Sequence, residues 1–266
     1  MAVTVKDVYA FIQEKAPFEL QLGFDNAGFL VGRSERKIDR ILVALDITED
    51  VIEEARQIGA QLIVSHHPVI WGGAKKITDE TVMGRKLLAL TESGIAAICA
   101  HTNLDAVADG VNDALAEALG LTEIAQLKQD GIDGQGRPYG IGRIGLMPTG
   151  YDTCSQFAEI VKEQLGAHGV RYVDAGRPVR IVAVGGGSCS DMVDLALAQG
   201  CDTFVTADVK YDGFLEAKAK GINLIDAGHY PTENVVCPVL ADWLSERFPE
   251  IEVMISELHE EVFNYL

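Results

Sequence analysis

The 266-residue chain is poor in positive charge and in cysteine. It carries 22 basic against 40 acidic residues, which gives a formal net charge of -18 at pH 7. A duplex nucleic-acid backbone would meet a repulsive field, so the composition argues against nucleic-acid binding. The five cysteines stand far apart and form no CxxC pair. This spacing predicts reduced thiols rather than a disulfide framework or a thiolate metal site.

Long apolar runs are also missing. No stretch of the sequence approaches the ~20 apolar residues that cross a bilayer. The N-terminal segment MAVTVKDVYAFIQEKAP has apolar residues at helical spacing, and charges interrupt it too often for a signal peptide. We therefore expect an amphipathic helix here, no membrane association and a cytoplasmic protein. The hydrophobic content of 48% is enough for a large core at this length.

Strand-like and helical segments alternate along most of the chain. In the first half, strands are predicted at 40–46, 60–67 and 95–101, and helices near 49–58, 81–92 and 109–119. A glycine-rich polar stretch at 128–140 breaks the alternation, which then resumes with strands at 141–147 and 179–188 and a helix near 153–165. This order predicts an α/β fold.

The second half of the sequence restates the order of elements in the first half. Residues 40–67 align with 180–210, and residues 94–105 align with 221–233. We predict one domain of two similar αβ lobes from an internal duplication, the first at about 1–127 and the second at about 128–266. The alternative is chance agreement, since all strand–turn–helix units share this pattern. Ligand sites of such sheets lie at the carboxyl ends of the strands, so we expect the loops that follow these strands to converge.

Four of the six histidines end predicted strands: His66, His67, His101 and His229. An acid stands four residues after two of them, Asp105 in the first half and Glu233 in the second. Imidazole nitrogen and carboxylate oxygen together suit zinc, iron, manganese or nickel. The other two histidines, His168 and His259, stand at a helix end or in a polar context and are expected to be solvated.

The number of candidate ligands exceeds what one tetrahedral catalytic ion needs, which is three protein ligands and a water. Five or six ligands match two divalent ions, and such a pair generates a hydroxide nucleophile near neutral pH. In SHHPVIW, neighbouring side chains of a strand would point to opposite faces. We expect the strand to end near Ser65, with Pro68 biasing His67 toward an extended or turn conformation. Each histidine then binds a different ion, or one binds and the other supports it.

Three further features have two interpretations each. The glycines of GGGS (185–188) either present backbone N–H groups to a phosphate or form a tight turn. Asp208 and Lys210 occupy in the second half the place that SHHP holds in the first half. Each of them therefore faces the same cleft as those histidines or lies on the surface. Asp25 either hydrogen-bonds a ligand histidine or forms an Asx-turn.

At these residues the chain resembles the GTP cyclohydrolase I type 2 family, also called the Ngg-interacting-factor-three-like family. The matching segments run in family order over nearly the whole chain: FDNAGFLVG, SHHPVIW, AHTNLDAV, GIGRIG, VAVGGGS, TADVKY and GHYPTEN. The resemblance implies a two-lobed αβ fold, a dinuclear metal site between the lobes and a toroidal homohexamer. Its implied metal ligands are His66, His67, Asp105, His229 and Glu233. His101 is implied as a residue near the site that orients a ligand or moves a proton.

The resemblance also implies an activity. Members are expected to hydrolyse GTP, another nucleotide or a related heterocycle through a metal-activated hydroxide. The chain departs from the family pattern at Phe24, where tryptophan is usual, and at Asp212, where many members have histidine. Neither position is an implied ligand. The alternative function is a non-enzymatic metal-binding scaffold or metal chaperone that assembles protein partners.

Overall fold

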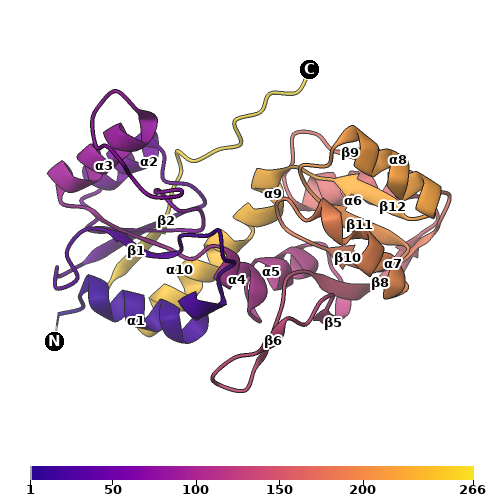
Figure 1. Cartoon of the computed structure of the whole chain (residues 1–266), viewed down its shortest axis with the longest axis horizontal. Coiled ribbons are helices and arrows are strands. Elements are labelled where there is room, and N and C mark those ends of the chain that lie inside the picture. The colour runs from indigo at the N-terminus through magenta and orange to yellow at the C-terminus, as the bar shows by residue number, and fades with distance from the viewer. Residues whose placement is uncertain (1) are drawn as a thin grey trace. The chain divides into compact units, whose positions relative to one another are not determined.

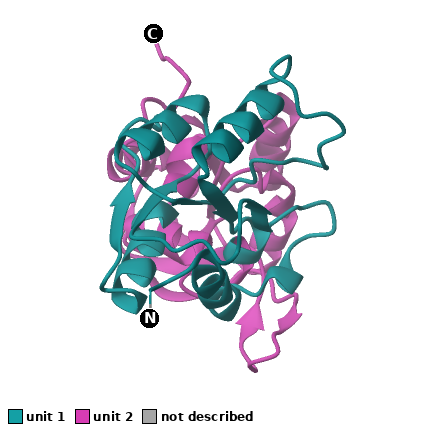
Figure 2. Ribbon diagram, turned by 90° about the vertical axis from the view of Figure 1, so that its left-hand side faces the viewer, with its two compact units in different colours: residues 1–104, 236–260 teal, residues 105–235, 261–266 magenta. Residues whose placement is uncertain are grey.

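The computed structural model describes residues 2–266, shown as a cartoon in Figure 1. The chain divides into two compact units (Figure 2). Unit 1 comprises the chain up to Leu104 together with Val236–Glu260, and unit 2 comprises Asp105–Val235 and Glu261–Leu266. Each unit is built around its own main sheet. In the part of the chain from residue 2 onward, no helix is long and apolar enough to cross a membrane.

Unit 1 contains a five-stranded sheet. Its strands lie in the order β1 (Gly28–Val31), β4 (Ala96–Cys99), β3 (Leu62–Ser65), β2 (Arg40–Ala44) and β13 (Glu252–Ile255). All neighbours pair in parallel except β1, which is antiparallel to β4. Every residue of β3 and β4 is buried, which is why all of their residues except Ser65 are apolar.

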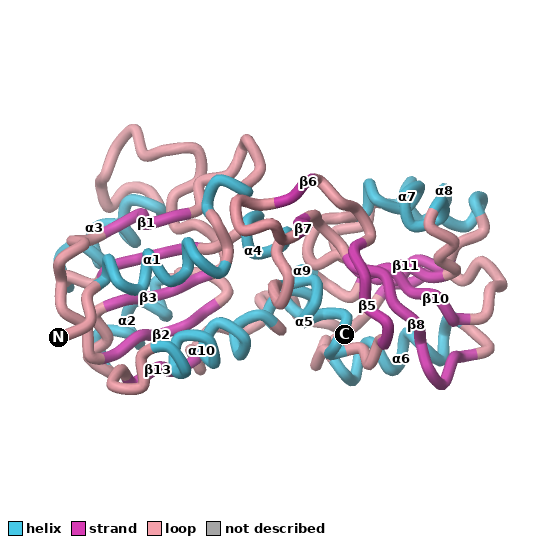
Figure 3. The backbone as a smooth tube through the Cα atoms, turned by 90° about the horizontal axis from the view of Figure 1, so that it is seen from below, coloured by secondary structure: helices cyan, strands magenta, loops and turns pink. Residues whose placement is uncertain are grey.

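Helices cover both faces of this sheet, as Figures 1 and 3 show. One face carries α2 (Glu49–Gln57) and α3 (Val82–Ser93), and the other carries α1 (Val5–Lys15) and α10 (Val236–Arg247). A short 3-10 helix, Phe18–Leu20, follows α1. Helix α1 is the amphipathic helix expected in the N-terminal segment, and Thr4 and Asp7 form a reciprocal capping box where it begins.

Unit 2 contains a six-stranded sheet. Its strands lie in the order β5 (Thr122–Gln126), β8 (Arg143–Tyr151), β10 (Val179–Val184), β11 (Thr203–Thr206), β12 (Asn223–Asp226) and β9 (Arg171–Val173). The central strands β10, β11 and β12 are parallel, and the outer strands pair antiparallel. Side chains alternate along β10, so Val182 and Val184 pack in one core cluster and Ala183 in the other.

The first cluster of unit 2 includes residues of α5 (Val111–Ala118) and α6 (Cys154–Gln164). The second includes residues of α7 (Val193–Ala198) and α8 (Tyr211–Lys220), and the 3-10 helix Ser190–Met192 precedes α7. The glycine-rich stretch forms a hairpin of β6 (Gly131–Ile132) and β7 (Pro138–Tyr139). Helices α4 (Thr102–Ala106) and α9 (His229–Asn234) carry candidate site residues.

The predicted α/β class is confirmed, with two sheets and helices between the parallel strands. Each sheet contains three neighbouring parallel strands in chain order, β2–β3–β4 and β10–β11–β12, and an antiparallel strand beside the third. The shared order is compatible with an internal duplication, which stays a prediction. Helix α4 is an element that the sequence pattern did not indicate.

Candidate metal centre

The two neighbouring histidines of SHHPVIW lie beyond the end of a strand. Strand β3 ends at Ser65, as predicted. The amide of His66 donates to the carbonyl of Ala44 at 3.3 Å, and the amide of His67 donates to that of Leu45 at 2.9 Å. The two imidazole centroids are 5.0 Å apart. Because the regular strand has ended, the backbone turns both rings toward one region.

A third histidine joins this pair within unit 1. His101 follows β4, which lies beside β3 in the same parallel sheet. Its ring centroid is 5.1 Å from that of His66 and 5.4 Å from that of His67. One ring nitrogen from each of the three lies within 4.8 Å of the others. The ring of Trp71 stands edge-on to His101 at 5.2 Å between centroids and walls one side of the cluster.

Each of these imidazoles is held through its Nδ1 atom. The Nδ1 partners are Ala100 O for His66 (2.9 Å), Asp46 Oδ1 for His67 (2.8 Å) and Asp25 Oδ1 for His101 (2.8 Å). A backbone carbonyl or an ionised carboxylate only accepts hydrogen bonds, so each Nδ1 carries the proton and donates. In this tautomer a neutral ring would present its Nε2 lone pair, which is the form that binds a metal.

The two carboxylates that hold these rings are ionised. Burial works to raise the pKa of Asp25, but hydrogen bonds from His101 and Thr102 outweigh it and lower that pKa to about 2. The same carboxylate also accepts the amide of its neighbour Asn26 at 2.7 Å, so Asp25 contacts both a site histidine and its own backbone segment. For Asp46, burial is likewise outweighed by hydrogen bonds from histidines, which hold its pKa far below the ordinary range.

The second histidine on Asp46 is His259, and here the expectation of a solvated side chain was wrong. Its Nε2 lies 3.2 Å from Asp46 Oδ2, and its side chain is only 8% exposed. Strand β13 pairs with β2, and the amide of Ser256 then donates to the carbonyl of Val43 at 2.8 Å. This pairing brings the C-terminal segment to the end of β2, where Asp46 stands.

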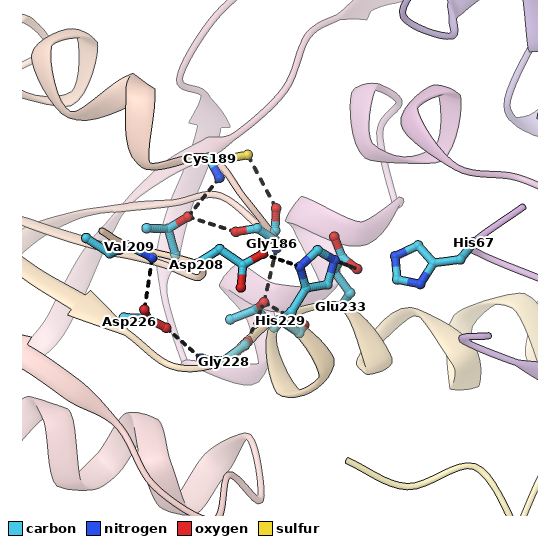
Figure 4. Close-up of polar contacts among 12 residues, drawn as sticks. His67, Gly186, Cys189, Asp208, Val209, Asp226, Gly228, His229 and Glu233 are labelled. Atoms are coloured by element: carbon cyan, nitrogen blue, oxygen red, sulfur yellow. Dashed lines mark hydrogen bonds and ion pairs between the residues drawn. The ribbon is translucent and has the colours of Figure 1, made fainter. Parts of the chain in front are cut away.

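Unit 2 contains a second group of candidate ligands. His229 and Glu233 stand one turn apart on α9, and His229 Nε2 lies 2.9 Å from Glu233 Oε2. The other ring nitrogen, Nδ1, lies 2.7 Å from Asp208 Oδ2 (Figure 4). A carboxylate oxygen of Asp105 lies within 4.8 Å of one of Glu233. Asp208 has a φ of 54°, an uncommon conformation for a residue with a side chain, and this turn aims its carboxylate at His229.

The triple-glycine turn after β10 packs against this group. The amide of Gly186 donates to Asn112 Oδ1 at 3.0 Å, and the amide of Gly187 donates to Thr232 Oγ1 at 3.1 Å. These amides are therefore used within the protein, which favours the tight-turn interpretation over a phosphate site. A Cβ on Gly187 would lie 2.1 Å from Glu233 Oε1, so the absent side chain makes room for that carboxylate.

Cys189 lies near Asp105 and Glu233, and its thiol is not a metal ligand of the thiolate type. Burial raises the pKa of Cys189, and the charges of Asp105 and Glu233 raise it further. The thiol stays protonated, and its Sγ donates to the carbonyl of Gly186. Lys210, the other residue considered for the cleft, is an exposed N-cap residue of α8.

The six site residues predicted from sequence thus form two groups, each within one unit. Unit 1 brings together His66, His67 and His101, and unit 2 brings together Asp105, His229 and Glu233. Sequence reasoning missed Asp46. Its position directly after the apolar run of β2 is the signal that would have indicated it, because acids at strand ends lie at the ligand-binding edge of an α/β sheet.

Comparisons with known proteins agree over the full length of the chain. The family model Duf34/NIF3 (NGG1p interacting factor 3) matches residues 3–261. A "GTP cyclohydrolase 1 type 2 homolog" of Clostridium perfringens is 34% identical over 264 residues, which cover 98% of this chain and 99% of that protein. A protein of the same description from Streptomyces coelicolor is 37% identical over 234 residues, 86% of this chain and 81% of that protein.

Solved structures show the same fold. A hypothetical protein of Staphylococcus aureus superposes with a TM-score of 0.92 at 28% identity and covers 100% of both chains. Reduced HcgD from Methanocaldococcus jannaschii has a TM-score of 0.79 at 28% identity, covering 97% of this chain and 99% of that one.

Proposed function

Because the chain belongs to the Duf34/NIF3 family, we propose that it is a metal-dependent hydrolase acting on a nucleotide or a related heterocycle. The description of its relatives as GTP cyclohydrolase 1 type 2 homologs supports the substrate class. The residues that carry the proposal are two groups of nitrogen and oxygen donors of the kind that divalent transition metals prefer.

The strongest support for the proposal is a hydrogen-bonding feature that four imidazoles share. The four Nδ1 atoms of His66, His67, His101 and His229 each contact an oxygen acceptor at 2.7–2.9 Å. This arrangement fixes the tautomer and the orientation of each ring, so Nε2 is the nitrogen that a metal would use. Such partners of ligand histidines are a general feature of metal sites. In His229 the Nε2 atom lies 2.9 Å from Glu233 Oε2, the other ligand proposed on α9.

We assign five metal ligands: His66, His67, Asp105, His229 and Glu233. Asp105 and Glu233 are buried carboxylates, and a bound cation would compensate the cost of burying their negative charge. Zinc, iron, manganese and nickel all suit this donor set.

Two bound ions would lower the pKa of a water molecule toward neutrality and polarise the group under attack. The protein itself supplies a proton carrier, His101. Asp25 holds the Nδ1 proton of this ring and stabilises the imidazolium, so Nε2 takes up a proton and returns it during hydrolysis. Trp71 packs edge-on to the ring and limits its rotation.

Metal content tests the proposal directly. Purified protein reconstituted with zinc, manganese or iron is expected to hold about two ions per chain. His67→Ala and Glu233→Ala are expected to hold fewer, because each removes a ligand from a different group. His168→Ala is the matched control, since this histidine has a side chain that is 58% exposed and contacts Glu261. Wild-type protein that stays near zero for all three metals would refute the proposal.

Turnover separates a hydrolase from a metal-binding scaffold or metal chaperone. Formate and phosphate release are followed for wild type and both ligand variants across a panel that includes GTP, ATP and CTP. The hydrolase is expected to release product from at least one nucleotide, and the variants to lose that activity. Equal, negligible turnover in all proteins, with metal loss only in the variants, would instead support the scaffold.

Two wider features belong to the same proposal. We propose that the protein forms a homohexamer, which light scattering would detect as six times the chain mass of 28.7 kDa. We also propose that the two units arose by internal duplication, supported by the shared order of β2–β3–β4 and β10–β11–β12. A monomer in solution would contradict the first of these statements.

A further inference from the structure

Unit 2 contains a cavity of about 250 Å³ beside His229. Its walls include three residues of the C-terminal segment and three polar side chains: Phe263, Asn264, Tyr265, Arg171, Asp208 and His229. We propose that this cavity binds the planar ring of a heterocycle with a lactam edge, meaning a ring N–H next to a ring carbonyl. The inference rests on the proposed function and names the part of the substrate that this surface recognises.

Aromatic rings form one wall of the cavity. Tyr265 packs on Gly169, where a Cβ would lie 2.5 Å from a ring atom, and its ring meets His168 edge-on. Its hydroxyl contacts Glu261 Oε1 at 3.4 Å, which helps to hold the ring. Phe263 is 59% exposed, although burial would be expected of so apolar a side chain. Exposed rings beside a cavity favour a ligand with a π-face, because stacking on a planar ring contributes ~1–3 kcal/mol per base.

Two polar side chains of the cavity determine which hydrogen-bonding groups a bound ring must carry on its edge. Arg171 directs Nη2 to Asp226 and to the carbonyl of Val209. Among residues 2–266, no hydrogen bond is formed by its Nε or Nη1, so these groups offer donors to a carbonyl. Asp208 uses Oδ2 for His229 and is about half exposed, so Oδ1 offers an acceptor to an N–H group. One donor and one acceptor together match a lactam edge.

The charge of the cavity excludes the phosphate part of a nucleotide from it. Asp226 is buried and pairs with Arg171, so it balances the only arginine of the wall. Asp208 adds a further carboxylate, whose partner in the wall is the imidazole of His229 and not a second arginine or a lysine. A phosphate here would meet net repulsion. The cavity therefore takes the neutral ring, and an anionic group of the same substrate lies outside it.

Calorimetric titration of the full chain with guanosine, inosine and adenosine tests this assignment. Guanosine and inosine carry the lactam edge, whereas adenosine carries no ring carbonyl. We expect adenosine to bind at least ~10-fold more weakly, because a site built to pair with a polar edge leaves its own groups unpaired on the wrong ligand. Equal affinity for the three nucleosides, or binding of none, would overturn the proposal.

Three variants locate the binding. Phe263→Ala is expected to weaken guanosine binding by ~5-fold or more through lost stacking. Val262→Ala is the matched control, because this neighbour is 82% exposed and lies outside the cavity wall, and its affinity should be unchanged. Arg171→Met is expected to reduce the preference for guanosine over adenosine. Arg171→Met also removes the ion pair with Asp226 and could fail to fold. In that case the comparison of Phe263→Ala with Val262→Ala decides whether guanosine binds in this cavity. Unchanged affinity in Phe263→Ala would overturn the proposal.

The titrations are made on metal-stripped and on reconstituted protein, so the failure of this inference is distinct from that of the proposed function. A lactam preference in metal-stripped protein would support the cavity even if no hydrolysis were found. Conversely, two bound ions and nucleotide turnover without any lactam preference would leave the hydrolase intact and remove the cavity assignment.

Discussion

Gly187 occupies a position where any side chain would collide with a candidate metal ligand, and Gly187→Ala is the perturbation that follows. The residue lies in the turn after β10 with a φ of +61°. An added Cβ would lie 2.1 Å from Glu233 Oε1 and 3.0 Å from its carboxyl carbon. The carboxylate is the end of a buried side chain on α9, so it must move away from the turn.

Two free-energy costs combine in this variant. Alanine in the left-handed region costs ~1–2 kcal/mol, and its smaller unfolded-state entropy offsets ~0.4–1 kcal/mol of that cost. Displacing Glu233 disturbs its 2.9 Å contact with His229 and leaves a buried carboxylate poorly solvated. Leaving this buried charged group without its partner adds ~1.5–3 kcal/mol. Together these terms predict a decrease of ~2–4 kcal/mol in the free energy of unfolding.

Comparison with Gly176→Ala separates the cost of displacing Glu233 from the backbone cost. Gly176 has a φ of +76° and nothing within 4 Å of an added Cβ, so it shares the backbone cost and lacks the collision. Urea unfolding of the metal-stripped proteins measures both variants without a contribution from bound ions. We expect Gly187→Ala to lose ~1.5–3 kcal/mol more than Gly176→Ala, and to hold less metal after reconstitution. Losses that agree within ~0.5 kcal/mol would refute the assigned role of this glycine.

Two further predictions concern residues that hold other residues in place. Asp46→Asn is expected to weaken metal binding by ~10–100-fold in a chelator competition, because the partner of His67 Nδ1 loses its charge. Asp39→Asn, at an exposed position, is the control. Equal metal affinities of the two variants would contradict the prediction. Arg143→Met is expected to lower the free energy of unfolding by ~3–5 kcal/mol, because buried Arg143 pairs with Asp113 and also donates to backbone carbonyls. A loss below ~1 kcal/mol in urea unfolding would contradict that role.

The sequence predicted those features that depend on local pattern. Buried parallel strands such as β3 and β4 are almost wholly apolar, so their ends are visible as the first polar residues, Ser65 and His101. The contact of His259 with Asp46 depends instead on β13 joining β2, and nothing in the segment EVMI identifies the strand that it pairs with. A polar context therefore suggested solvent for a side chain that long-range pairing buries.

Matching spacing in the two halves also did not determine matching geometry. His229 and Glu233 lie within one helix and contact each other directly. His101, by contrast, precedes its helix and turns its Nδ1 to Asp25, a residue from a separate loop. The four-residue spacing therefore locates an acid near each histidine, whereas the acid that fixes the ring comes from elsewhere in the fold. Both rings end in the same tautomer because each meets an oxygen acceptor at Nδ1, and this common result, more than the spacing, is what prepares each ring to bind a metal through Nε2.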